Sequence, residues 1–493
     1  MLLSQILADV EFTASADIIG IDIADIVYDS RKPEAAGCLF VCLVGARMDG
    51  HDFAMSVYDK GCRAFLVERR LPLPVDAVQI VTPDTRLALA LTSAAFFEHP
   101  ARSLAIIGVT GTKGKTTVAS LARDILAAGG INTAYIGTTG IYYNGVRTVT
   151  KNTTPESYEL HRAFRKMADA GVAAVVMEVS SQAMFMHRVA GIHFHIGVFT
   201  NLSRDHIGGV EHPTFEHYMS CKAELFRQCR YGIFNSDDAH FTDMARASNC
   251  IRQTFGMDEG TAHDITAKPL GIWKSGNILG ERFLCRTPLG EREYELRMPG
   301  KFNIYNAIAA IAVAERMQIP AEITADALRR AAVSGRFEIV DALPDAVTLI
   351  DYAHNKASME AALHTLRAYE PRRLVVLFGS IGDRAKERRA ELGRAVSELA
   401  DFGIITSDNP GYENPEDILR DIEANMTGAC PYVSFADRRE AVRYAIDNAR
   451  AGDCILFAGK GHEQYQIVNG DYVHYDEREE IAAAAAARIA RIQ

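Results

Sequence analysis

The chain contains the stretch Gly108-Val-Thr-Gly-Thr-Lys-Gly-Lys-Thr-Thr117 between two apolar segments. An apolar run at 104–109 leads into it, and a run compatible with a helix at 118–128 leads out. A strand, a glycine-rich loop and a helix in this order form a phosphate cradle, because the loop N–H groups and the positive end of the helix dipole point at phosphate oxygens. We expect Lys115 to reach the β- and γ-phosphates of a nucleotide and the Thr116 hydroxyl to bind Mg²⁺.

The glycines of this stretch are displaced from the strict phosphate-loop pattern. That pattern has a glycine five residues before Gly114, where this chain has Val109, and the glycines fall at 108, 111 and 114 instead. The strand, the glycines and the helix together still predict a nucleotide-binding site. Its candidate residues for ATP are Gly111, Thr112, Lys113, Gly114, Lys115, Thr116 and Thr117.

Composition excludes several classes of protein. The 493 residues are too many for one core, and the hydrophobic content of 48% and charged content of 24% are typical of a soluble globular protein. The net charge of −10 argues against a nucleic-acid binder that works through a basic surface. The first twelve residues carry Asp9 and Glu11 but no basic segment, and no apolar run is long enough to span a membrane, so we expect a cytoplasmic protein without membrane insertion. The nine cysteines include no CxxC pair and indicate reduced thiols.

Apolar strands alternate with helical patterns, which predicts βαβ units. We therefore expect an α/β protein with a central, mostly parallel sheet of the phosphate-loop type, flanked by an N-terminal α/β domain and a C-terminal Rossmann-like α/β domain. The predicted domains are 1–100, 101–333 and 334–493. In the first, Asp29-Ser30-Arg31 is either a solvated turn or a polar clamp for a ligand, and Asp84 is the expected N-cap of a helix.

Three polar side chains of the central domain are candidates for chemistry. Glu178 directly follows the apolar run 173–177, where a carboxylate beside a phosphate loop would hold Mg²⁺, although it could equally be a structural carboxylate. His206 lies in the loop after the strand predicted at 196–200 and is either a metal ligand or a structural histidine. Lys222 lies among apolar residues of a predicted helix, where a lysine usually extends its amine to solvent.

The last part of the chain offers further ligand contacts. Asn303 and Asn306 share one face of a predicted helix and could hold a base or ribose, or Asn303 could simply cap the helix. Beyond them, four predicted strands each end in a polar or glycine-rich loop, and such loops form the ligand-binding rim of an open α/β sheet. These strands lie at 347–351, 374–378, 402–406 and 454–458.

Taken together, the motifs resemble those of the Mur ligases. They lie in family order from Asp29 to the last hundred residues, so the resemblance covers essentially the whole chain. It is strongest to the members that add the third residue of the peptidoglycan stem peptide. Besides the displaced loop, the resemblance depends on Asn152-Thr-Thr-Pro155, Met177-Glu-Val-Ser-Ser181, Thr200-Asn-Leu-Ser-Arg-Asp-His206, Lys222-Ala-Glu-Leu-Phe226, Phe302-Asn-Ile-Tyr-Asn306, Asp351-Tyr-Ala-His354, Ser407-Asp-Asn-Pro410 and Ala458-Gly-Lys-Gly-His-Glu463.

The resemblance implies an ATP-dependent acid–amino-acid ligase of peptidoglycan synthesis, and hence a role in cell-wall biogenesis, cell shape and cell division. ATP would phosphorylate a carboxylate of UDP-N-acetylmuramoyl-L-alanyl-D-glutamate, and the amine of L-lysine, meso-diaminopimelate or another diamino acid would attack the acyl phosphate. Two anions must approach each other in this reaction, which requires Lys115, Mg²⁺ and arginines nearby. The partners would be small molecules, and we expect a monomer.

The resemblance also implies roles for individual residues. The catalytic residues would be Lys115, Glu178, His206 and Lys222. The Mg²⁺ ligands would be Thr116, Glu178, His206 and Lys222, the last as N6-carboxylysine, because carbamylation turns an amine into an anionic oxygen ligand. Further nucleotide contacts would come from Asn303, Asn306, Arg336, Asp351 and His354. The UDP-muramoyl-dipeptide would contact Asp29, Ser30, Asn152, Thr153, Thr154, Ser180 and Arg188. The incoming amino acid would contact Arg384, Asp408, Asn409, Gly459 and Glu463.

Several positions depart from the family pattern. In members that use meso-diaminopimelate, an arginine that pairs with the distal carboxylate follows Asp-Asn-Pro, and here that residue is Gly411. Because a buried carboxylate without its bidentate partner costs binding energy, Gly411 favours L-lysine or another diamino acid. Gln182, Met186 and Asn355-Lys356 also differ from the usual residues. These departures indicate a divergent member, or a paralogue with an altered substrate.

Two alternatives stay open. One is a different ligase of the same superfamily, such as another Mur step or an enzyme of the folylpolyglutamate type. Asp29-Ser30-Arg31 and Asp49-Gly50 favour the third-step ligase over it. The other is a nucleotide-binding scaffold with little catalysis. The presence of Lys115, Glu178, His206 and Lys222 counts against that alternative.

Overall fold

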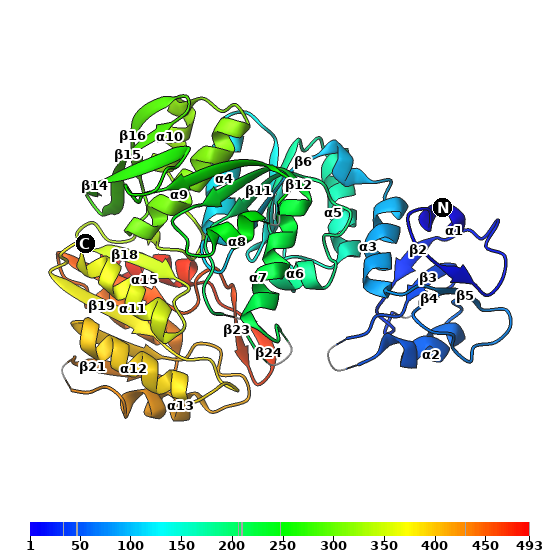
Figure 1. Ribbon diagram of the computed structural model, residues 1–493. Helices are drawn as coiled ribbons and strands as arrows, with labels where there is room; N and C mark the ends of the chain where they lie inside the picture. The colour runs from blue at the N-terminus through cyan, green and yellow to red at the C-terminus, as the bar shows by residue number, and fades with distance from the viewer. Residues whose placement is uncertain are drawn as a thin grey trace. The chain divides into compact units, whose positions relative to one another are not determined.

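The computed structural model describes residues 1–32, 34–45, 48–205, 207–208, 211–246, 248–428 and 430–492. The chain divides into two compact units. The first unit consists of Met1–Ile265 and Ala309–Pro320, and the second of Thr266–Ile308 and Ala321–Gln493. Figure 1 shows the elements along the chain. The division into three domains, with boundaries near residues 100 and 334, stays a prediction.

The first unit begins with a small α/β fold built on a five-stranded sheet. The strand order is β1-β5-β4-β3-β2, and all neighbours are parallel except β1 and β5. Asp84 caps the longest helix here, as predicted, because its carboxylate accepts from the N–H groups of Arg86 and Leu87. The elements are α1 (Leu3–Ile6), β1 (Thr13–Ala14), β2 (Asp25–Val27), β3 (Cys38–Val41), η1 (Gly50–Phe53), α2 (Ala54–Asp59), β4 (Ala64–Val67), β5 (Val78–Val81) and α3 (Thr85–Phe96).

The larger sheet of the first unit carries the phosphate loop. Its strands run in the order β13-β12-β11-β6-β10-β7-β8-β9, parallel from β13 to β7 and antiparallel from β7 to β9. The strands are β6 (Ala105–Thr110), β7 (Thr133–Gly137), β8 (Gly140–Tyr143), β9 (Val146–Thr148), β10 (Ala174–Glu178), β11 (Phe194–Phe199), β12 (Cys229–Asn235) and β13 (Ile251–Gly256). The helices are η2 (Pro100–Ser103), α4 (Lys115–Ala128), α5 (Ser157–Asp169), α6 (Ser181–Phe185), α7 (Phe215–Ala223), η3 (Glu224–Arg227) and α8 (Phe241–Arg246).

The apolar run before the phosphate loop is the central strand β6, between β11 and β10. Ile106, Ile107 and Val109 are each 0% exposed, because helices cover both faces of a parallel sheet. Helix α4 packs on β6, β7 and β10. The predicted strand–loop–helix arrangement is confirmed.

The second unit contains an antiparallel three-stranded segment and a second α/β sheet. The α/β sheet has the order β17-β18-β22-β19-β20-β21 and is parallel except at β17. The strands are β14 (Ile265–Ser275), β15 (Ile278–Thr287), β16 (Gly290–Leu296), β17 (Glu338–Val340), β18 (Val347–Asp351), β19 (Arg373–Phe378), β20 (Phe402–Thr406), β21 (Tyr432–Phe435), β22 (Asp453–Ala458), β23 (Tyr465–Val468) and β24 (Asp471–His474). The helices are α9 (Lys301–Arg316, of which Lys301–Ile308 belongs to this unit), α10 (Ala321–Arg329), α11 (Lys356–Arg367), α12 (Glu387–Leu399), α13 (Pro415–Glu423), α14 (Arg438–Asp447) and α15 (Glu477–Ile492).

Strand β19 shows how the second α/β sheet is buried on both faces. Leu374, Val376 and Phe378 join one apolar cluster, whereas Val375 and Leu377 join the other. Successive side chains of a strand point to opposite faces, so a continuous apolar run satisfies both cores. The four predicted rim strands are β18, β19, β20 and β22, and they are neighbours in this sheet.

The predicted fold class, α/β with mostly parallel sheets, is confirmed. The sequence reasoning missed the antiparallel strands β14–β16 and the hairpin β23–β24. No helix among the described residues is both long and apolar enough to cross a membrane.

A buried histidine of α5 should make stability depend on pH. His161 is 1% exposed among Leu160 and Phe164, and burial lowers its pKa to about 4. Its folded pKa lies below the unfolded value, so stability is full above about pH 6.5 and falls as the unfolded chain binds the proton. We expect the wild type to lose about 2 kcal/mol of unfolding free energy between pH 7 and pH 5 through this group, and His161→Leu to lose that part of the slope. Urea denaturation at both pH values measures it, and an unchanged slope in the variant would contradict the assignment.

Candidate functional site

The phosphate loop has a backbone that only glycine fits at two positions. Gly111 has φ +146°, and a Cβ there would lie 2.0 Å from Thr200 Oγ1. Gly114 has φ +86° and is the N-cap of α4. Lys115 folds back over the loop and donates to the carbonyls of Gly111 (2.9 Å) and Thr112 (3.1 Å). The displaced glycines therefore still build a tight loop before a helix N-terminus, which is a ready anion-binding site.

Lys222 meets Lys115 at the same carbonyl. Its side chain on α7 is 2% exposed, and its Nζ donates to the Gly111 carbonyl at 2.9 Å. The expectation of a lysine that extends to solvent is therefore wrong. Burial, together with the Lys115 cation, lowers the pKa of Lys222 well below its usual value. The buried amine is thus biased toward its neutral, nucleophilic form.

Glu178 is the last residue of β10 and is 1% exposed. Its carboxylate accepts from the Thr116 hydroxyl (3.0 Å), the Tyr135 hydroxyl (2.6 Å) and the Thr138 N–H (2.9 Å). Burial raises the pKa of Tyr135 well above its usual value, and the Glu178 carboxylate adds to this shift. Thr116 and Glu178, two of the four predicted Mg²⁺ ligands, are thus in direct contact. Hydroxyl and carboxylate oxygens are the donors that Mg²⁺ prefers, so this pair fits the ion.

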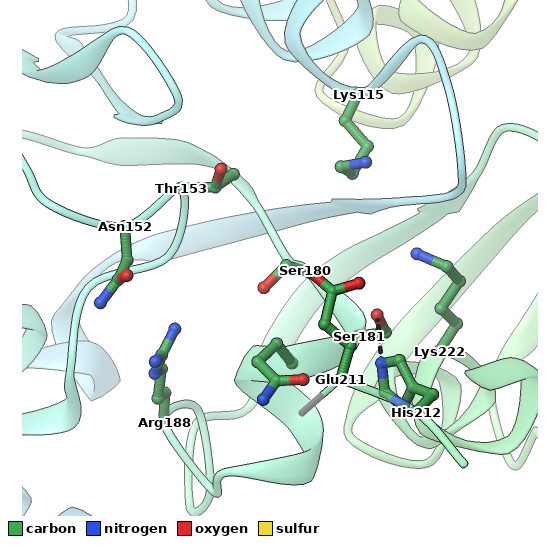
Figure 2. A pocket seen from close by; sticks show the side chains of 10 residues that line it. Lys115, Asn152, Thr153, Ser180, Ser181, Arg188, Glu211, His212 and Lys222 are labelled. Atoms are coloured by element: carbon green, nitrogen blue, oxygen red, sulfur yellow. Dashed lines mark hydrogen bonds between the residues drawn. The ribbon is translucent and has the colours of Figure 1, made fainter. Parts of the chain in front are cut away.

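A cavity of about 260 Å³ opens beside both lysines, and Figure 2 shows its lining. Six predicted site residues line it together, namely Lys115, Asn152, Thr153, Ser180, Arg188 and Lys222. Thr154 is not among them, because it is fully buried and its hydroxyl donates to the Glu178 carbonyl at 2.9 Å. Arg188 is held by Glu156 at 2.7 Å. The structure brings most of the predicted substrate residues of the central domain into one cavity.

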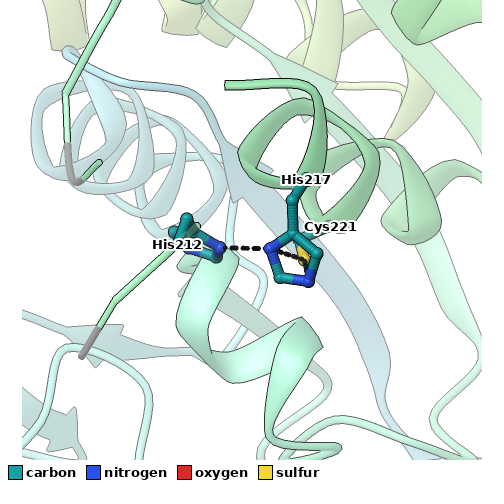
Figure 3. A group of neighbouring side chains, drawn as sticks. All are labelled: His212, His217 and Cys221. Carbon is teal, nitrogen blue, oxygen red and sulfur yellow. Dashed lines mark hydrogen bonds between the residues drawn. The ribbon is translucent and has the colours of Figure 1, made fainter. Parts of the chain in front are cut away.

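The sequence reasoning did not select four other residues of this cavity, Ser181, Gln182, Glu211 and His212. His212 Nε2 lies 2.9 Å from Ser181 Oγ. Figure 3 shows that the other side of its ring faces His217. A histidine six residues after the Ser-Arg-Asp-His motif was the available signal. His206 itself lies outside the described residues.

Three other predicted residues of the phosphate loop differ in burial, since Thr112 and Thr117 are buried and Lys113 is exposed. Thr112 is 5% exposed, and its hydroxyl lies 3.0 Å from the Tyr218 hydroxyl. Lys113 is exposed and pairs with Asp205 at 3.1 Å. Thr117 is buried in the first turn of α4. Thr112 and Lys113 thus connect the phosphate loop to Tyr218 and Asp205.

A second, larger cavity of about 980 Å³ lies in the first unit. Asp29, Ser30 and Arg31 form part of its wall, together with Tyr28 and Tyr158. The Arg31 guanidinium donates to Asp29 at 2.7 and 2.8 Å and holds the pKa of that carboxyl down at about 2. The stretch is a turn, and it also faces a cavity large enough for a ligand.

In the second unit, three predicted nucleotide residues surround Tyr352. The Asp351 carboxylate accepts from the Phe337 N–H at 2.9 Å, and burial raises its pKa. The Arg336 guanidinium lies 5.0 Å from the centre of the Tyr352 ring. The His354 Nδ1 lies 2.8 Å from the Tyr352 carbonyl. These contacts bring Arg336, Asp351 and His354 together.

Asn303 and Asn306 are joined on α9. Asn306 donates to the Asn303 amide oxygen at 2.9 Å, and Asn303 donates to the Pro299 carbonyl at 2.7 Å. Both are buried. Asn303 is the third residue of α9 and its side chain donates to a carbonyl, so it is not the N-cap that the capping alternative predicted, whereas the two amides do share one face.

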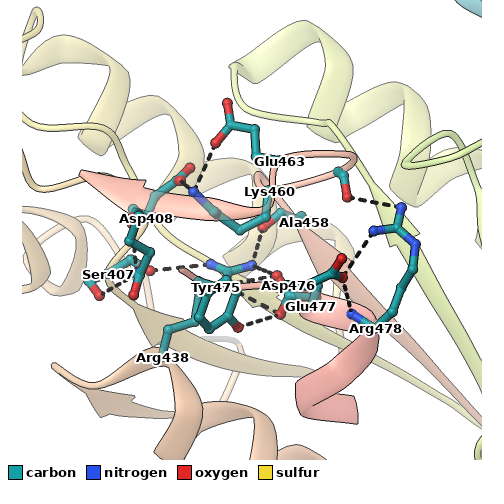
Figure 4. Close-up of polar contacts among 12 residues, drawn as sticks. Ser407, Asp408, Arg438, Ala458, Lys460, Glu463, Tyr475, Asp476, Glu477 and Arg478 are labelled. Atoms are coloured by element: carbon teal, nitrogen blue, oxygen red, sulfur yellow. Dashed lines mark hydrogen bonds and ion pairs between the residues drawn. The ribbon is translucent and has the colours of Figure 1, made fainter. Parts of the chain in front are cut away.

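Four predicted amino-acid residues form one cluster at the rim of the second α/β sheet. Lys460, which the sequence reasoning did not select, is 0% exposed and donates to Asn409 and Glu463, each at 2.8 Å. Asp408 lies 3.5 Å from the same amine. A Cβ on Gly459 would lie 2.8 Å from Asp408, so this glycine allows the close approach. Figure 4 shows Asp408, Lys460 and Glu463 of this group.

Arg384, the fifth predicted amino-acid residue, is exposed on the segment after β19. Within the described ranges, no hydrogen bond joins it to the cluster. Gly411 has φ +63°, and a Cβ there would lie 2.1 Å from Asp383 Oδ2. Asp383 also accepts from the Tyr412 N–H at 3.1 Å. The backbone at 411 is therefore built for glycine, with a carboxylate beside it.

An ion pair with no exposed atoms lies beneath this rim. Arg438 donates to Glu477 at 2.8 Å and to the Ala458 carbonyl at 2.9 Å, and both charged side chains are 0% exposed (Figure 4). The Tyr475 hydroxyl donates to Glu477 at 3.1 Å. The pair ties α14 to the start of α15 and to the end of β22.

Comparison with known proteins agrees with the fold and the loop. Residues 109–314 match the Mur ligase middle domain, and residues 335–461 match the Mur ligase glutamate ligase domain. The chain is 38% identical over 487 residues to the UDP-N-acetylmuramoyl-L-alanyl-D-glutamate–2,6-diaminopimelate ligase of Clostridium perfringens (strain 13 / Type A), covering 97% of this chain and 98% of the relative.

Two further proteins extend the comparison. The ligase of the same name from Geobacillus kaustophilus (strain HTA426) is 39% identical over 478 residues, covering 95% of this chain and 96% of that one. A solved structure of a ligase of this name superimposes with a TM-score of 0.69 at 29% identity, covering 95% of each chain. The fold, the loop and these matches define an ATP-dependent ligase. The chain belongs to the Mur ligase family.

The buried Arg438–Glu477 pair should be essential for the second unit. Arg438→Met leaves the Glu477 carboxylate buried without a cationic partner, so we expect a loss of about 3–5 kcal/mol of unfolding free energy. Arg420→Met is the matched control, because Arg420 pairs with Asp417 on the surface and should change stability by less than about 0.5 kcal/mol. Urea denaturation followed by circular dichroism measures both, and equal effects of the two substitutions would contradict this role of the buried pair.

Proposed function

We propose that this protein uses ATP to join an amino acid to UDP-N-acetylmuramoyl-L-alanyl-D-glutamate, the third addition to the peptidoglycan stem peptide. The observation that carries the proposal is a full-length similarity to ligases of that name, combined with a phosphate loop whose lysine and neighbouring carboxylate are in place. The fold alone does not select this reaction, because related folds serve other substrates.

In this proposal the first unit binds the triphosphate and the UDP-muramoyl-dipeptide. The N–H groups of residues 111–117 hold the phosphates, and Lys115 leaves the Gly111 carbonyl to reach them. The cavity lined by Asn152, Thr153, Ser180 and Arg188 holds the dipeptide carboxylate, and the cavity beside Asp29 and Ser30 takes the uridine end. Thr154 would act through the Glu178 carbonyl that it contacts.

Thr116 and Glu178 would hold Mg²⁺, with His206 and a carbamylated Lys222 as further ligands. When bound, Mg²⁺ neutralises phosphate charge so that the acceptor carboxylate can approach. The protein residues contribute positioning and charge. Lys115 stabilises the transferring phosphate, and Arg188 orients the acceptor carboxylate.

Lys222 has the surroundings that a carbamate needs. Carbamylation requires a neutral amine, and burial with a neighbouring lysine favours that form. The product is an anion, which the Lys115 cation would stabilise at the shared Gly111 carbonyl. The modification would thus turn a repulsive pair of amines into an attractive one.

The second unit would supply further contacts to the nucleotide and bind the incoming amino acid. The nucleotide residues are Asn303, Asn306, Arg336, Asp351 and His354. The amino-acid residues are Asp408, Asn409, Gly459 and Glu463, with Arg384 for the α-carboxylate. Lys460 holds Asn409 and Glu463 in place. The acidic groups suit an ammonium ion.

The surroundings of Gly411 favour an amino acid without a distal carboxylate. Position 411 has no side chain, and the Asp383 carboxylate lies beside it. A second carboxylate there would face repulsion from Asp383. We therefore propose L-lysine or another simple diamino acid as the better substrate, although the relatives are named as 2,6-diaminopimelate ligases.

An amino-acid panel tests this function. With ATP, Mg²⁺ and UDP-N-acetylmuramoyl-L-alanyl-D-glutamate, we expect phosphate release to need an added amino acid and to be faster with L-lysine than with meso-diaminopimelate. Asp383→Asn should raise the relative rate with meso-diaminopimelate by up to about fivefold, because an exposed charge contact is worth up to about 1 kcal/mol.

The panel also separates the alternatives. Phosphate release that no amino acid stimulates would contradict the proposed ligase activity. Stimulation by a pterin substrate in place of the muramoyl-dipeptide would assign the chain to the folylpolyglutamate type instead. A higher rate with meso-diaminopimelate than with L-lysine would overturn the assignment based on Gly411 alone.

The carbamate on Lys222 can be detected directly. After incubation with ¹³C-bicarbonate, we expect a labelled carbamate carbon in the NMR spectrum of the wild type. Lys222→Gln should remove that signal, whereas Lys113→Gln, which changes an exposed lysine of the same loop region, should keep it. A spectrum in which Lys222→Gln removes no signal would show that this lysine is unmodified.

A further inference from the structure

Three side chains with nitrogen or sulfur donors gather beside one face of α7. His217 and Cys221 lie four residues apart on this helix and so share one face, and His212 comes from the segment before it (Figure 3). One donor atom from each of the three lies within 4.8 Å of the other two. His212 and Cys221 are buried, and His217 is half-buried. No role in the proposed ligase reaction uses this set.

The spacing of the donor atoms is close to that of a tetrahedral metal site. His212 Nδ1 lies 2.9 Å from His217 Nδ1, and Cys221 Sγ lies 3.8 Å from the same His217 nitrogen. Zinc bond lengths place two ligating nitrogens about 3.3 Å apart, and a nitrogen and a sulfur about 3.6 Å apart. Small side-chain rotations therefore suffice to admit an ion, which would replace the proton shared by the two imidazoles.

The surroundings fix the rings in the orientation that a metal site requires. His212 Nε2 lies 2.9 Å from Ser181 Oγ, so the nitrogen opposite the cluster already has a partner. Ligating histidines usually engage their second nitrogen in this way, which sets the tautomer and aims the first nitrogen at the ion. The Phe185 ring packs edge-on against His217, with ring centres 4.9 Å apart. This contact limits the rotation of His217.

We propose that His212, His217 and Cys221 bind a transition-metal ion of the zinc class, with water or solvent as a fourth ligand. Two imidazoles and a thiolate are soft or borderline donors, which favour Zn²⁺ or Co²⁺ over Mg²⁺. Binding releases the proton of the Cys221 thiol, whereas the proton between the two Nδ1 atoms moves to the Nε2 of one of the rings, so both imidazoles stay neutral and no electron transfer is involved. The site is chemically unlike the oxygen pair of Thr116 and Glu178.

Such an ion would join two parts of the site already described. His212 lines the cavity beside Lys115, and Cys221 directly precedes Lys222 on α7. A metal bond between these segments would fix the cavity wall relative to the helix that carries Lys222. The ion would act as a structural clamp and would not touch the reacting groups.

Cobalt titration of the full-length protein tests the site. After chelation, and with excess Mg²⁺ present to occupy oxygen sites, we expect one equivalent of Co²⁺ to produce thiolate-to-cobalt absorption in the near ultraviolet, which Zn²⁺ then abolishes by displacement. Cys221→Ser should lose this band. Ser181→Ala should weaken cobalt binding about tenfold or more, because it removes the partner that orients His212.

Two further variants keep the test decisive. Cys250→Ser is the matched control, since Cys250 is a partly exposed cysteine outside the cluster, and the band should persist in it. His217→Gln keeps the sulfur but should lose stoichiometric binding, and this result stands even if Cys221→Ser fails to fold. A band that survives both Cys221→Ser and His217→Gln, or that disappears with Cys250→Ser, would overturn the proposal, as would the absence of a band in the wild type.

Discussion

Two lysine amines share one backbone carbonyl, that of Gly111, and the rest of the site depends on this contact. Burial of the Lys222 amine, and then the neighbouring Lys115 cation, disfavour its charged form, so the pKa of Lys222 falls. The electrostatic repulsion between the two amines falls when an anion is added, either the phosphates of a nucleotide near Lys115 or a carboxyl group on Lys222. The loop is thus arranged for negative charge.

Strand register determines which groups surround that carbonyl. Glu178 of β10 pairs with Val109 of β6, and Phe199 of β11 pairs with Thr110. The carboxyl ends of three adjacent parallel strands therefore finish at the same level, and the residues that follow them converge. A shift by one residue would turn Glu178 to the other face of the sheet and separate it from Thr116. The buried apolar runs that prevent such a shift are therefore as important for the site as the polar residues.

The parts of the fold that could be predicted are those that short stretches of sequence specify. The apolar runs, the glycines at 111 and 114 and the cap at Asp84 each specify structure within a few residues, and the structure confirms them. The antiparallel strands β14–β16 were missed because half-exposed strands carry a weaker signal than buried parallel ones. The burial of Lys222 could not be predicted from its position in the helix, because that position does not reveal which residues pack against the helix.

The same reasoning explains why the choice of amino acid is harder to predict than the reaction. The loop that binds phosphate is contiguous in sequence, whereas the conformation of Gly411 depends on a distant hairpin. The Gly411 N–H donates to the Ile467 carbonyl at 3.0 Å, and the Asn469 N–H donates to the Gly411 carbonyl at 2.7 Å. These two bonds hold Gly411, whose φ of +63° disfavours a side chain, and a Cβ there would meet the Asp383 carboxylate. Substitution of Gly411 alone would therefore clash with Asp383, so a change of amino-acid preference at this position requires residues of both segments to change together.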